Sequence, residues 1–353
     1  MLFTGIAWTG QGFDLAFRDD GADVPAGPPV HVPAGRVTGL IDLLLDRSRR
    51  AAAGLTCVVD STNGMVDGGL MAAGLRVVRA DPWTLPDRPA FGSVDADTLA
   101  RTAASRGADL IPLVLQSGSL TGRSPDHERT FRESAPAVKL LTATGRCLTS
   151  GRRDPSDKVV ALTFDDGPHP PFTGRVLDVL DRYDVPATFF CVGLHASAHT
   201  EELARMAAAG HGLGNHTWSH PFLPDLSLRE LDLQLERTDE AIESVVGAQP
   251  VRLFRPPYGS RTSDVVSWLG RDGGPTVVLW DVDTGDWAMP GAPAIAATVL
   301  DQTRPGSIVL MHDGGGDRSD TAEALPAVIE GLLARGYRFA RVDELVQAGL
   351  TGT

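Results

Sequence analysis

Residues 159–169 read Val-Val-Ala-Leu-Thr-Phe-Asp-Asp-Gly-Pro-His, an apolar run with β-branched residues that stops at two adjacent carboxylates. Such a run predicts a buried strand, and Gly167-Pro168 predicts the turn that ends it. Asp165 and Asp166 would then lie at the carboxyl end of the strand, where α/β proteins gather their catalytic groups. Taken alone, the pair is equally typical of a turn that begins with Asp before Gly-Pro.

Further along the chain, His216 and His220 stand four positions apart in Gly-Asn-His-Thr-Trp-Ser-His. Residues with this spacing share one face of a helix, so we expect both imidazoles to reach the same cation. Two imidazoles and one carboxylate make an open three-ligand site, which leaves room for water and substrate on a catalytic divalent metal. A single His-x-x-x-His is also typical of a chance surface pair, so the prediction depends on the polar clusters that accompany it.

Three more polar clusters follow apolar, strand-like runs, at residues 254–259, 280–287 and 308–313. An Arg is always charged and can keep a nearby carboxylate ionised. An Asp beside a His can raise the pKa of the imidazole, which then donates a proton. A salt bridge, a turn and a core His are the structural alternatives for the separate clusters. Together, five polar clusters at strand ends predict a hydrolase.

These clusters make residues 155–350 resemble the polysaccharide deacetylase family, which is also called carbohydrate esterase family 4 or the NodB-homology domain. The five motifs of that family occur in order and without departure, as Thr163-Phe-Asp-Asp-Gly167, His216-Thr-Trp-Ser-His220, Arg255-Pro-Pro-Tyr258, Asp283-Thr-Gly-Asp-Trp287 and Leu310-Met-His312. The alternation of strand-like and helix-like runs here indicates a parallel sheet that closes, or nearly closes, into a barrel. The resemblance implies a distorted, incomplete TIM-like (β/α) barrel.

The resemblance also implies roles for the motif residues that remove and deliver protons. Asp165 would be the general base, oriented by Arg255, and His312 would be the general acid. An acidic residue of the fourth motif would tune His312; we favour Asp286 and keep Asp283 open.

The metal ligands and the substrate contacts are likewise implied by the resemblance. The metal ligands would be Asp166, His216 and His220, and the ion would be Zn²⁺ or another divalent transition metal such as Co²⁺, Ni²⁺ or Mn²⁺. The backbone amide of Tyr258 would help to stabilise the oxyanion, and Trp287 and Leu310 would wall the acetyl pocket.

The implied activity is that of a metal-dependent N-deacetylase, a hydrolase of linear amide C–N bonds. We expect it to cleave the acetamide of an N-acetylated amino sugar, or of a compound that contains one, into amine and acetate. Peptidoglycan and chitin oligosaccharides are the alternative substrates. An inactive glycan-binding module, or one associated with nucleic acid, is the alternative from another class of protein.

Residues 1–125 show short strand-like runs that alternate with helical patterns, which indicates a small α/β domain of unknown role. Residues 1–120 faintly resemble the ribonuclease-H-like domain of insertion-sequence transposases, whose catalytic carboxylates end successive strands. The matching segments are Gly5–Trp8, Val59–Gly64 and Val94–Asp97, but Ala7 stands where that family has an acidic residue. A two-metal nuclease site would therefore be incomplete, and we expect a degenerate module. Residues 126–154 are expected to be a linker with one short helix near Pro136–Thr142.

The formal net charge of −13 and the sequence pI near 5.1 disfavour phosphate-rich partners, so we expect no nucleic acid or anionic membrane to bind non-specifically. No run approaches the roughly 20 apolar residues of a membrane span, and no signal peptide is recognised at the first residues. We therefore expect a cytoplasmic enzyme and a small-molecule or oligosaccharide N-acetyl substrate, although relatives in the resembled family are often secreted. The oligomeric state is not predicted. Cys57, Cys147 and Cys191 are expected to be buried thiols.

Overall fold

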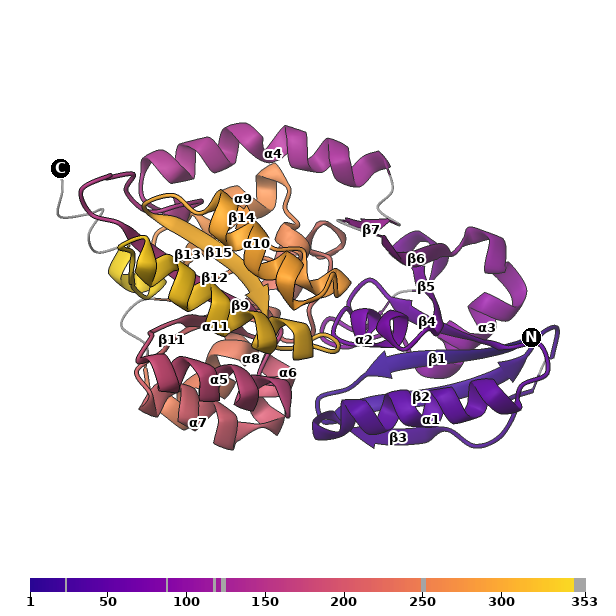
Figure 1. The fold of residues 1–353 in the computed structure, drawn as a ribbon. Coiled ribbons are helices and arrows are strands. Elements are labelled where there is room, and N and C mark those ends of the chain that lie inside the picture. The colour runs from indigo at the N-terminus through magenta and orange to yellow at the C-terminus, as the bar shows by residue number, and fades with distance from the viewer. Residues whose placement is uncertain (23, 87, 117–118, 122–124, 249–251, 346–353) are drawn as a thin grey trace.

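The computed structural model describes residues 1–345 except 23, 87, 117–118, 122–124 and 249–251. These residues form two sheets, one from each half of the chain, and each sheet carries its own helices (Figure 1). The predicted combination of a small N-terminal α/β domain and a larger barrel-like domain is confirmed.

The N-terminal sheet has the strand order β3-β2-β1-β4-β5-β6-β7. Its strands are β1 (Leu2–Trp8), β2 (Gly12–Asp19), β3 (Val30–Pro33), β4 (Leu55–Asp60), β5 (Arg76–Ala80), β6 (Ile111–Gln116) and β7 (Ser119–Thr121). The first three strands form an antiparallel meander, and β4 and β5 continue the sheet parallel to β1. Because side chains alternate along a strand, the two faces are covered by different helices. One face packs on α1 (Val37–Arg50) and α2 (Asp67–Ala72), and the other packs on α3 (Ala96–Arg106).

The C-terminal sheet is parallel throughout, with the strand order β14-β15-β9-β10-β11-β12-β13-β8 and with β16 also paired to β9. Its strands are β8 (Cys147–Leu148), β9 (Val159–Asp165), β10 (Thr188–Cys191), β11 (Gly212–Asn215), β12 (Leu253–Phe254), β13 (Thr276–Val278), β14 (Val282–Asp283), β15 (Ser307–His312) and β16 (Arg338–Phe339). All seven residues of β9 are buried, as expected for the central strand of a parallel sheet that is covered on both faces. In the described residues the two outermost strands do not pair, so the sheet is a curled, incomplete barrel, as predicted.

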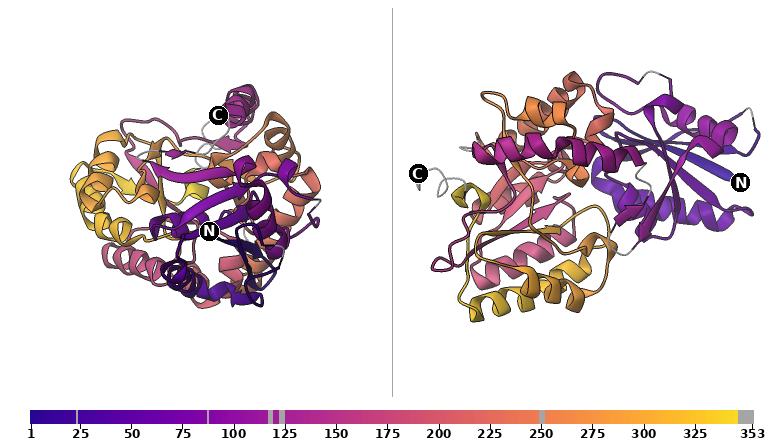
Figure 2. Two further views of the ribbon diagram at one scale, coloured as in Figure 1. Left: turned by 90° about the vertical axis from the view of Figure 1, so that its right-hand side faces the viewer. Right: turned by 90° about the horizontal axis from the view of Figure 1, so that it is seen from above.

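Helices cover the outside of this barrel (Figures 1 and 2). They are α5 (Phe172–Tyr183), α6 (Gly193–Ala198), α7 (Thr200–Ala208), α8 (Leu228–Val246), α9 (Ser263–Leu269), α10 (Ala292–Gln302) and α11 (Ser319–Ala334). The main core lies between them and the central strands, with Phe164 stacked on Phe189 at a ring separation of 5.1 Å. None of the described helices combines the length and the apolar character that crossing a membrane requires.

The expected linker over residues 126–154 is largely regular structure, which corrects the prediction. A long helix, α4 (Pro125–Ala143), lies across the second domain and contacts α9 and β8, and β8 adds an edge strand to the second sheet (Figure 1). The short helix expected near 136–142 is the end of this longer one. Pro136, inside the helix, suggested a helix start, because proline is common at first turns and disfavoured in interiors.

The two halves of the chain share an apolar interface. One buried cluster combines side chains of the first half with three from the second, namely Val192, Leu194 and Trp218. Beside it, the Ser219 hydroxyl donates to the Thr62 carbonyl at 2.6 Å and the Phe222 N–H donates to the Ser61 carbonyl at 2.8 Å. This interface holds the N-terminal domain against the carboxyl ends of β11 and β12, where the site described below is located. The three cysteines are buried free thiols, as predicted.

Candidate active site

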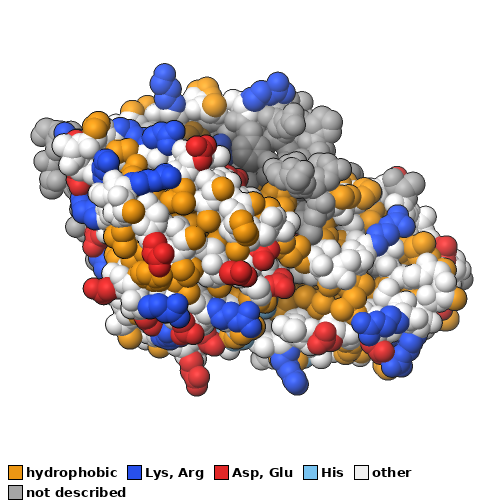
Figure 3. Space-filling model, viewed as in Figure 1, with side chains coloured by type: hydrophobic (Ala, Val, Ile, Leu, Met, Phe, Trp, Pro, Cys, Tyr) orange, Lys and Arg blue, Asp and Glu red, His pale blue; other side chains and the backbone are white. Residues whose placement is uncertain are grey.

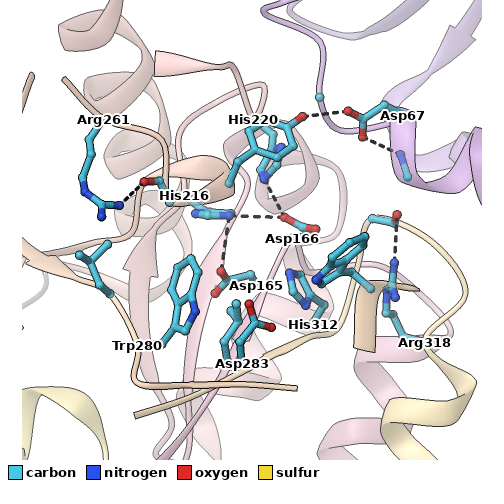
Figure 4. Close-up of a pocket in the computed structure, with 18 of the residues that line it drawn as sticks. Asp67, Asp165, Asp166, His216, His220, Arg261, Trp280, Asp283, His312 and Arg318 are labelled. Atoms are coloured by element: carbon cyan, nitrogen blue, oxygen red, sulfur yellow. Dashed lines mark hydrogen bonds and ion pairs between the residues drawn. The ribbon is translucent and has the colours of Figure 1, made fainter. Parts of the chain in front are cut away.

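The five sequence motifs meet in one pocket of about 480 Å³ at the carboxyl ends of the parallel strands (Figure 4). Parallel strands end at the same edge of a sheet, so motifs that are far apart in sequence converge there. Nine of the eleven predicted site residues line the pocket; these are Asp165, Asp166, His216, His220, Tyr258, Asp283, Trp287, Leu310 and His312. The other two lie behind lining residues, because Arg255 contacts Asp165 and Asp286 contacts His312.

Among the described residues, Asp166, His216 and His220 make up the group of side chains that could hold a metal ion. Their ligand atoms all lie within 4.8 Å of one another. The Asp166 Oδ1 atom lies 3.4 Å from His216 Nε2 and 3.2 Å from His220 Nε2. The two histidines belong to the loop after β11, not to a helix, so the helical prediction was wrong. Thr217 and His220 adopt positive φ angles of 69° and 54°, which turn the backbone so that both rings reach Asp166 without helical spacing.

The surroundings of this cluster fit a divalent cation. His216 Nδ1 lies 2.7 Å from the Arg255 carbonyl, which can only accept, so Nδ1 carries the proton and Nε2 is free to bind a metal. Burial lowers the pKa of His220 to about 3, which keeps this imidazole neutral as a ligand must be. Asp166 Oδ1 is buried without a hydrogen-bond partner, a costly arrangement that a bound cation would relieve.

Asp165 forms an ion pair with Arg255, whose side chain is fully buried. The Arg255 Nη1 donates to Asp165 Oδ1 at 2.7 Å and to the Thr163 hydroxyl at 2.8 Å. The other carboxylate oxygen, Asp165 Oδ2, lies 3.7 Å from His216 Nε2 and therefore faces the metal-binding cluster. The guanidinium itself lies over the Phe190 ring, 4.1 Å from its centroid, so its position is fixed by packing as well as by hydrogen bonds.

His312, at the end of β15, is paired with Asp286. His312 Nδ1 lies 2.7 Å from Asp286 Oδ1, and the His312 backbone N–H donates to Asp286 Oδ2 at 2.8 Å. Burial lowers the pKa of His312, but the Asp286 carboxylate, with smaller contributions from Asp166 and Asp165, outweighs burial and raises the pKa to about 9. Asp283 lies exposed at the rim and accepts the Gly285 N–H instead. Of the two acids left open by the sequence, Asp286 is the one that contacts His312.

The predicted substrate-contacting residues lie around the same space. Trp287 and Leu310 line the pocket beside His312. Tyr258 has a positive φ of 56°, and its ring packs against His220 at a centroid separation of 4.4 Å. The Tyr258 hydroxyl donates to Asp67 Oδ2 at 2.9 Å, a contact with the N-terminal domain that sequence analysis did not anticipate.

Several further pocket residues were given no binding or catalytic role from the sequence. They include Gly64, Asp67 and Gly68 from the N-terminal domain and Val138, Thr149, Arg261, Trp280, Gly315 and Arg318 from the rest of the chain. Burial raises the pKa of Asp67 to about 7. The Gly-rich run around Asp67 was visible in the sequence, but nothing in it indicated which part of the second half it would contact.

The carboxylates that resembled a nuclease site have structural contacts instead. Asp60 accepts hydrogen bonds from the Thr62 backbone and hydroxyl and from Ser93 and Val94. Asp95 caps α3, and Asp97 pairs with Arg18 at 2.8 Å. The described part of the face in Figure 3 shows basic side chains interspersed with acidic ones rather than gathered into one area.

Comparisons with known proteins agree with this site. Residues 152–276 match the family model described as Polysaccharide deacetylase. The chitooligosaccharide deacetylase of Sinorhizobium fredii is 41% identical over 198 residues, which cover 53% of this chain and 90% of that protein. The peptidoglycan-N-acetylmuramic acid deacetylase PdaC of Bacillus subtilis is 40% identical over 192 residues; this match covers 54% of this chain but only 39% of that protein.

Among solved structures, the Bc1960 peptidoglycan N-acetylglucosamine deacetylase matches with a TM-score of 0.56 and 35% identity, covering 59% of this chain and 95% of that one. An incomplete parallel barrel with this site at the carboxyl ends of its strands defines a hydrolase of the metal-dependent deacetylase class. The chain belongs to the polysaccharide deacetylase family. The family match begins at residue 152, so the resemblance of residues 1–120 to transposase domains stays a prediction.

Proposed function

We propose that this protein removes the acetyl group from an N-acetylated amino sugar, or from a compound that contains one, and releases the amine and acetate. The observation that carries the proposal is the arrangement of Asp165 and His312, which lie side by side on β9 and β15 in register and flank the Asp-His-His cluster. An amide needs a base to activate water and an acid to protonate the amine that leaves, and this pocket supplies both.

Asp166, His216 and His220 would hold a divalent ion, and their nitrogen and oxygen donors suit Zn²⁺, with Co²⁺, Ni²⁺ or Mn²⁺ as alternatives. When bound, such an ion polarises the acetamide carbonyl and lowers the pKa of water.

The chain's own residues then have separate tasks. Asp165 takes the proton of the attacking water through Oδ2, while Arg255 keeps Oδ1 engaged and fixes the direction of the carboxylate. The Tyr258 backbone N–H would donate to the oxyanion that develops on the acetyl carbonyl.

On the leaving-group side, His312 donates its Nε2 proton to the departing nitrogen. The pKa near 9 keeps the imidazole protonated at neutral pH, and Asp286 holds the ring through Nδ1. Trp287 and Leu310 would pack on the acetyl methyl group, which favours a small apolar acyl group over a larger or charged one.

The substrate is proposed from the relatives and from the pocket. The relatives are named as deacetylases of chitooligosaccharides and of peptidoglycan, so a sugar-borne acetamide is the substrate class that we propose. Peptidoglycan and chitin oligosaccharides remain the second candidates, and the cytoplasmic location stays a prediction. An inactive binding module has no physical need for a paired base, a paired acid and three converging metal ligands, and this argues for catalysis.

Acetate release provides the test. The purified protein would be incubated with N-acetylglucosamine, chitooligosaccharides and peptidoglycan fragments, with and without a chelator, and bound metal would be measured by elemental analysis. We expect chelator-sensitive acetate release from at least one of these substrates, and none from Asp165→Asn. Metal-loaded protein that releases no acetate from any of them would contradict the proposal.

A further inference from the structure

One end of the active-site pocket is built by the N-terminal domain. Residues 64–68, which we call the 64–68 segment, run from the loop after β4 into the first turn of α2. Gly64, Asp67 and Gly68 line the pocket together with the motif residues, and Figure 4 shows Asp67 on the N-terminal ribbon at the edge of the site.

The 64–68 segment packs closely against the catalytic domain at two positions, Gly64 and Gly68. A β-carbon added to Gly64 would lie 2.0 Å from the Tyr258 hydroxyl and 2.3 Å from the His220 carbonyl. One added to Gly68 would lie 2.5 Å from the carbonyl of Gly315, which follows β15. Only glycine permits so close an approach of the backbone. The segment therefore spans from the metal-ligand loop to the loop that follows the general acid.

Asp67 is the one ionisable side chain that this segment places at the pocket. It is 8% exposed, its Oδ1 accepts the Gly68 N–H at 2.6 Å, and its Oδ2 accepts the Tyr258 hydroxyl at 2.9 Å. A carboxylate has about four acceptor positions, so these two hydrogen bonds orient the group without using all of its acceptor capacity.

The chain of the Bc1960 deacetylase leaves little room for an equivalent wall, although PdaC, of which the match covers 39%, is much longer than the matched domain. The match to the Bc1960 deacetylase covers 95% of that chain, so only about a twentieth of it is left over. That remainder is too short to form a domain of the size of residues 1–125. The closed end is therefore a feature of this chain and not of the matched deacetylase domain.

Resting on the deacetylase activity proposed above, we propose that the 64–68 segment closes one end of the pocket, so that the enzyme acts on the terminal N-acetylated sugar of a short substrate. We further propose that Asp67 is a specificity-determining residue that accepts a hydrogen bond from a hydroxyl of that sugar. An internal unit of a polymer needs free space on both sides, whereas a terminal unit needs it on one. The remainder of the substrate extends toward Trp280 and Arg261, at the other end of the pocket.

The closed end is tested by the position of deacetylation. Wild-type protein loaded with metal would be incubated with chitotetraose, and mass spectrometry of the fragments would identify the sugar that lost its acetyl group. Loss confined to one terminal unit is the expected result. Loss from internal units at a comparable rate would overturn the closed-end proposal while leaving the deacetylase activity intact.

The role of Asp67 is tested by Asp67→Asn, with Asp42→Asn on the exposed side of α1 as the matched control. The asparagine side chain has nearly the same volume, and its amide oxygen can still accept the Gly68 N–H. Its amide NH2, a donor, takes the place of the oxygen that accepts the Tyr258 hydroxyl. We expect KM for chitotetraose to rise about tenfold with kcat within about twofold, as loss of one hydrogen bond predicts. Metal content and the thermal midpoint should match those of the control. An unchanged KM, or a loss in kcat alone, would overturn the role.

Binding without turnover separates this inference from the activity on which it rests. Calorimetric titration of chitotetraose into Asp165→Asn, and into the Asp165→Asn protein that also carries Asp67→Asn, measures affinity directly. An affinity about tenfold lower in the double variant than in Asp165→Asn supports the role of Asp67, even if the wild type releases no acetate. Equal affinities in the two proteins overturn that role. Absence of acetate with binding retained would instead count against the proposed function.

Discussion

Replacing Asp286 with asparagine removes the charge that keeps His312 protonated. Asparagine has nearly the same volume, and its amide oxygen can still accept the His312 backbone N–H, so the fold around β15 should persist. The substitution therefore removes the charge of the carboxylate together with the hydrogen bond that it accepts from His312 Nδ1.

The size of the effect follows from two opposing influences on the pKa of His312. Burial lowers it, whereas Asp286 and, to a smaller extent, Asp166 and Asp165 raise it, with a result of about 9 against an ordinary 6.5. The variant loses the largest of the raising effects, so the pKa should fall toward 6.5. At a pKa of 6.5 the protonated fraction at pH 8 would drop from about nine-tenths to about a thirtieth, so kcat should fall by up to about 30-fold.

The assay is the pH profile of kcat/KM for acetate release, measured for the wild type, for Asp286→Asn and for Asp283→Asn. We expect the wild type to lose activity on the alkaline side near pH 9, the Asp286 variant to lose it at a clearly lower pH, by up to about two units, and the Asp283 variant to follow the wild type. An unshifted alkaline limb in Asp286→Asn, or an equal shift in Asp283→Asn, would refute the assignment of His312 as the acid tuned by Asp286.

The same pair predicts how stability depends on pH. The pKa of His312 is higher in the folded protein than its ordinary value, so folding favours the protonated form. This stabilisation is fully present below about pH 6.5 and is lost as the pH rises through about 9, by an amount on the order of 3 kcal/mol. Urea unfolding of the wild type between these two pH values should show the loss, and Asp286→Asn should show much less of it.

Four further substitutions test the site and the interface. His216→Ala should lose both metal and activity, whereas Asp165→Asn should keep its metal and lose turnover, because only the first removes a ligand; equal metal content in the two would contradict these roles. Arg255→Met leaves the Asp165 carboxylate buried without its partner, so the free energy of unfolding should fall by about 3–5 kcal/mol in urea titrations, and a fall below about 1 kcal/mol would speak against it. Gly64→Ala places a methyl group 2.0 Å from the Tyr258 hydroxyl, so we expect about 1–3 kcal/mol of destabilisation and faster proteolysis between the domains; a stability equal to that of the wild type would mean that the contact is loose.

Most secondary structure was predictable because it follows from local periodicity. The buried strand predicted to stop at the two carboxylates is β9, which ends at Asp165, and the predicted alternation of strands and helices in residues 1–125 appears as β4, α2, β5, α3 and β6. The motif residues were predictable for a related reason. Strand ends carry catalytic groups in α/β folds, and five ordered motifs leave few alternative arrangements.

Local patterns failed where the backbone departs from regular geometry. The spacing of His216 and His220 indicated a helix, but the chain brings the two rings together through positive φ angles in a loop. The proline at 136 suggested a short helix, yet α4 continues through it because packing on α9 stabilises the longer helix. In both cases tertiary contacts outweigh the local preference.

The class of chemistry and the motif residues that meet in the pocket could be read from the sequence alone, because the motifs are local and follow strand-like runs. That Asp286 rather than Asp283 contacts His312, and that the 64–68 segment lies at the pocket, became visible with the fold. Asp67 meets Tyr258 across a separation of 191 residues. Contacts over such distances depend on how two folded surfaces fit together, and no periodicity, cap or turn signal in either segment encodes that fit.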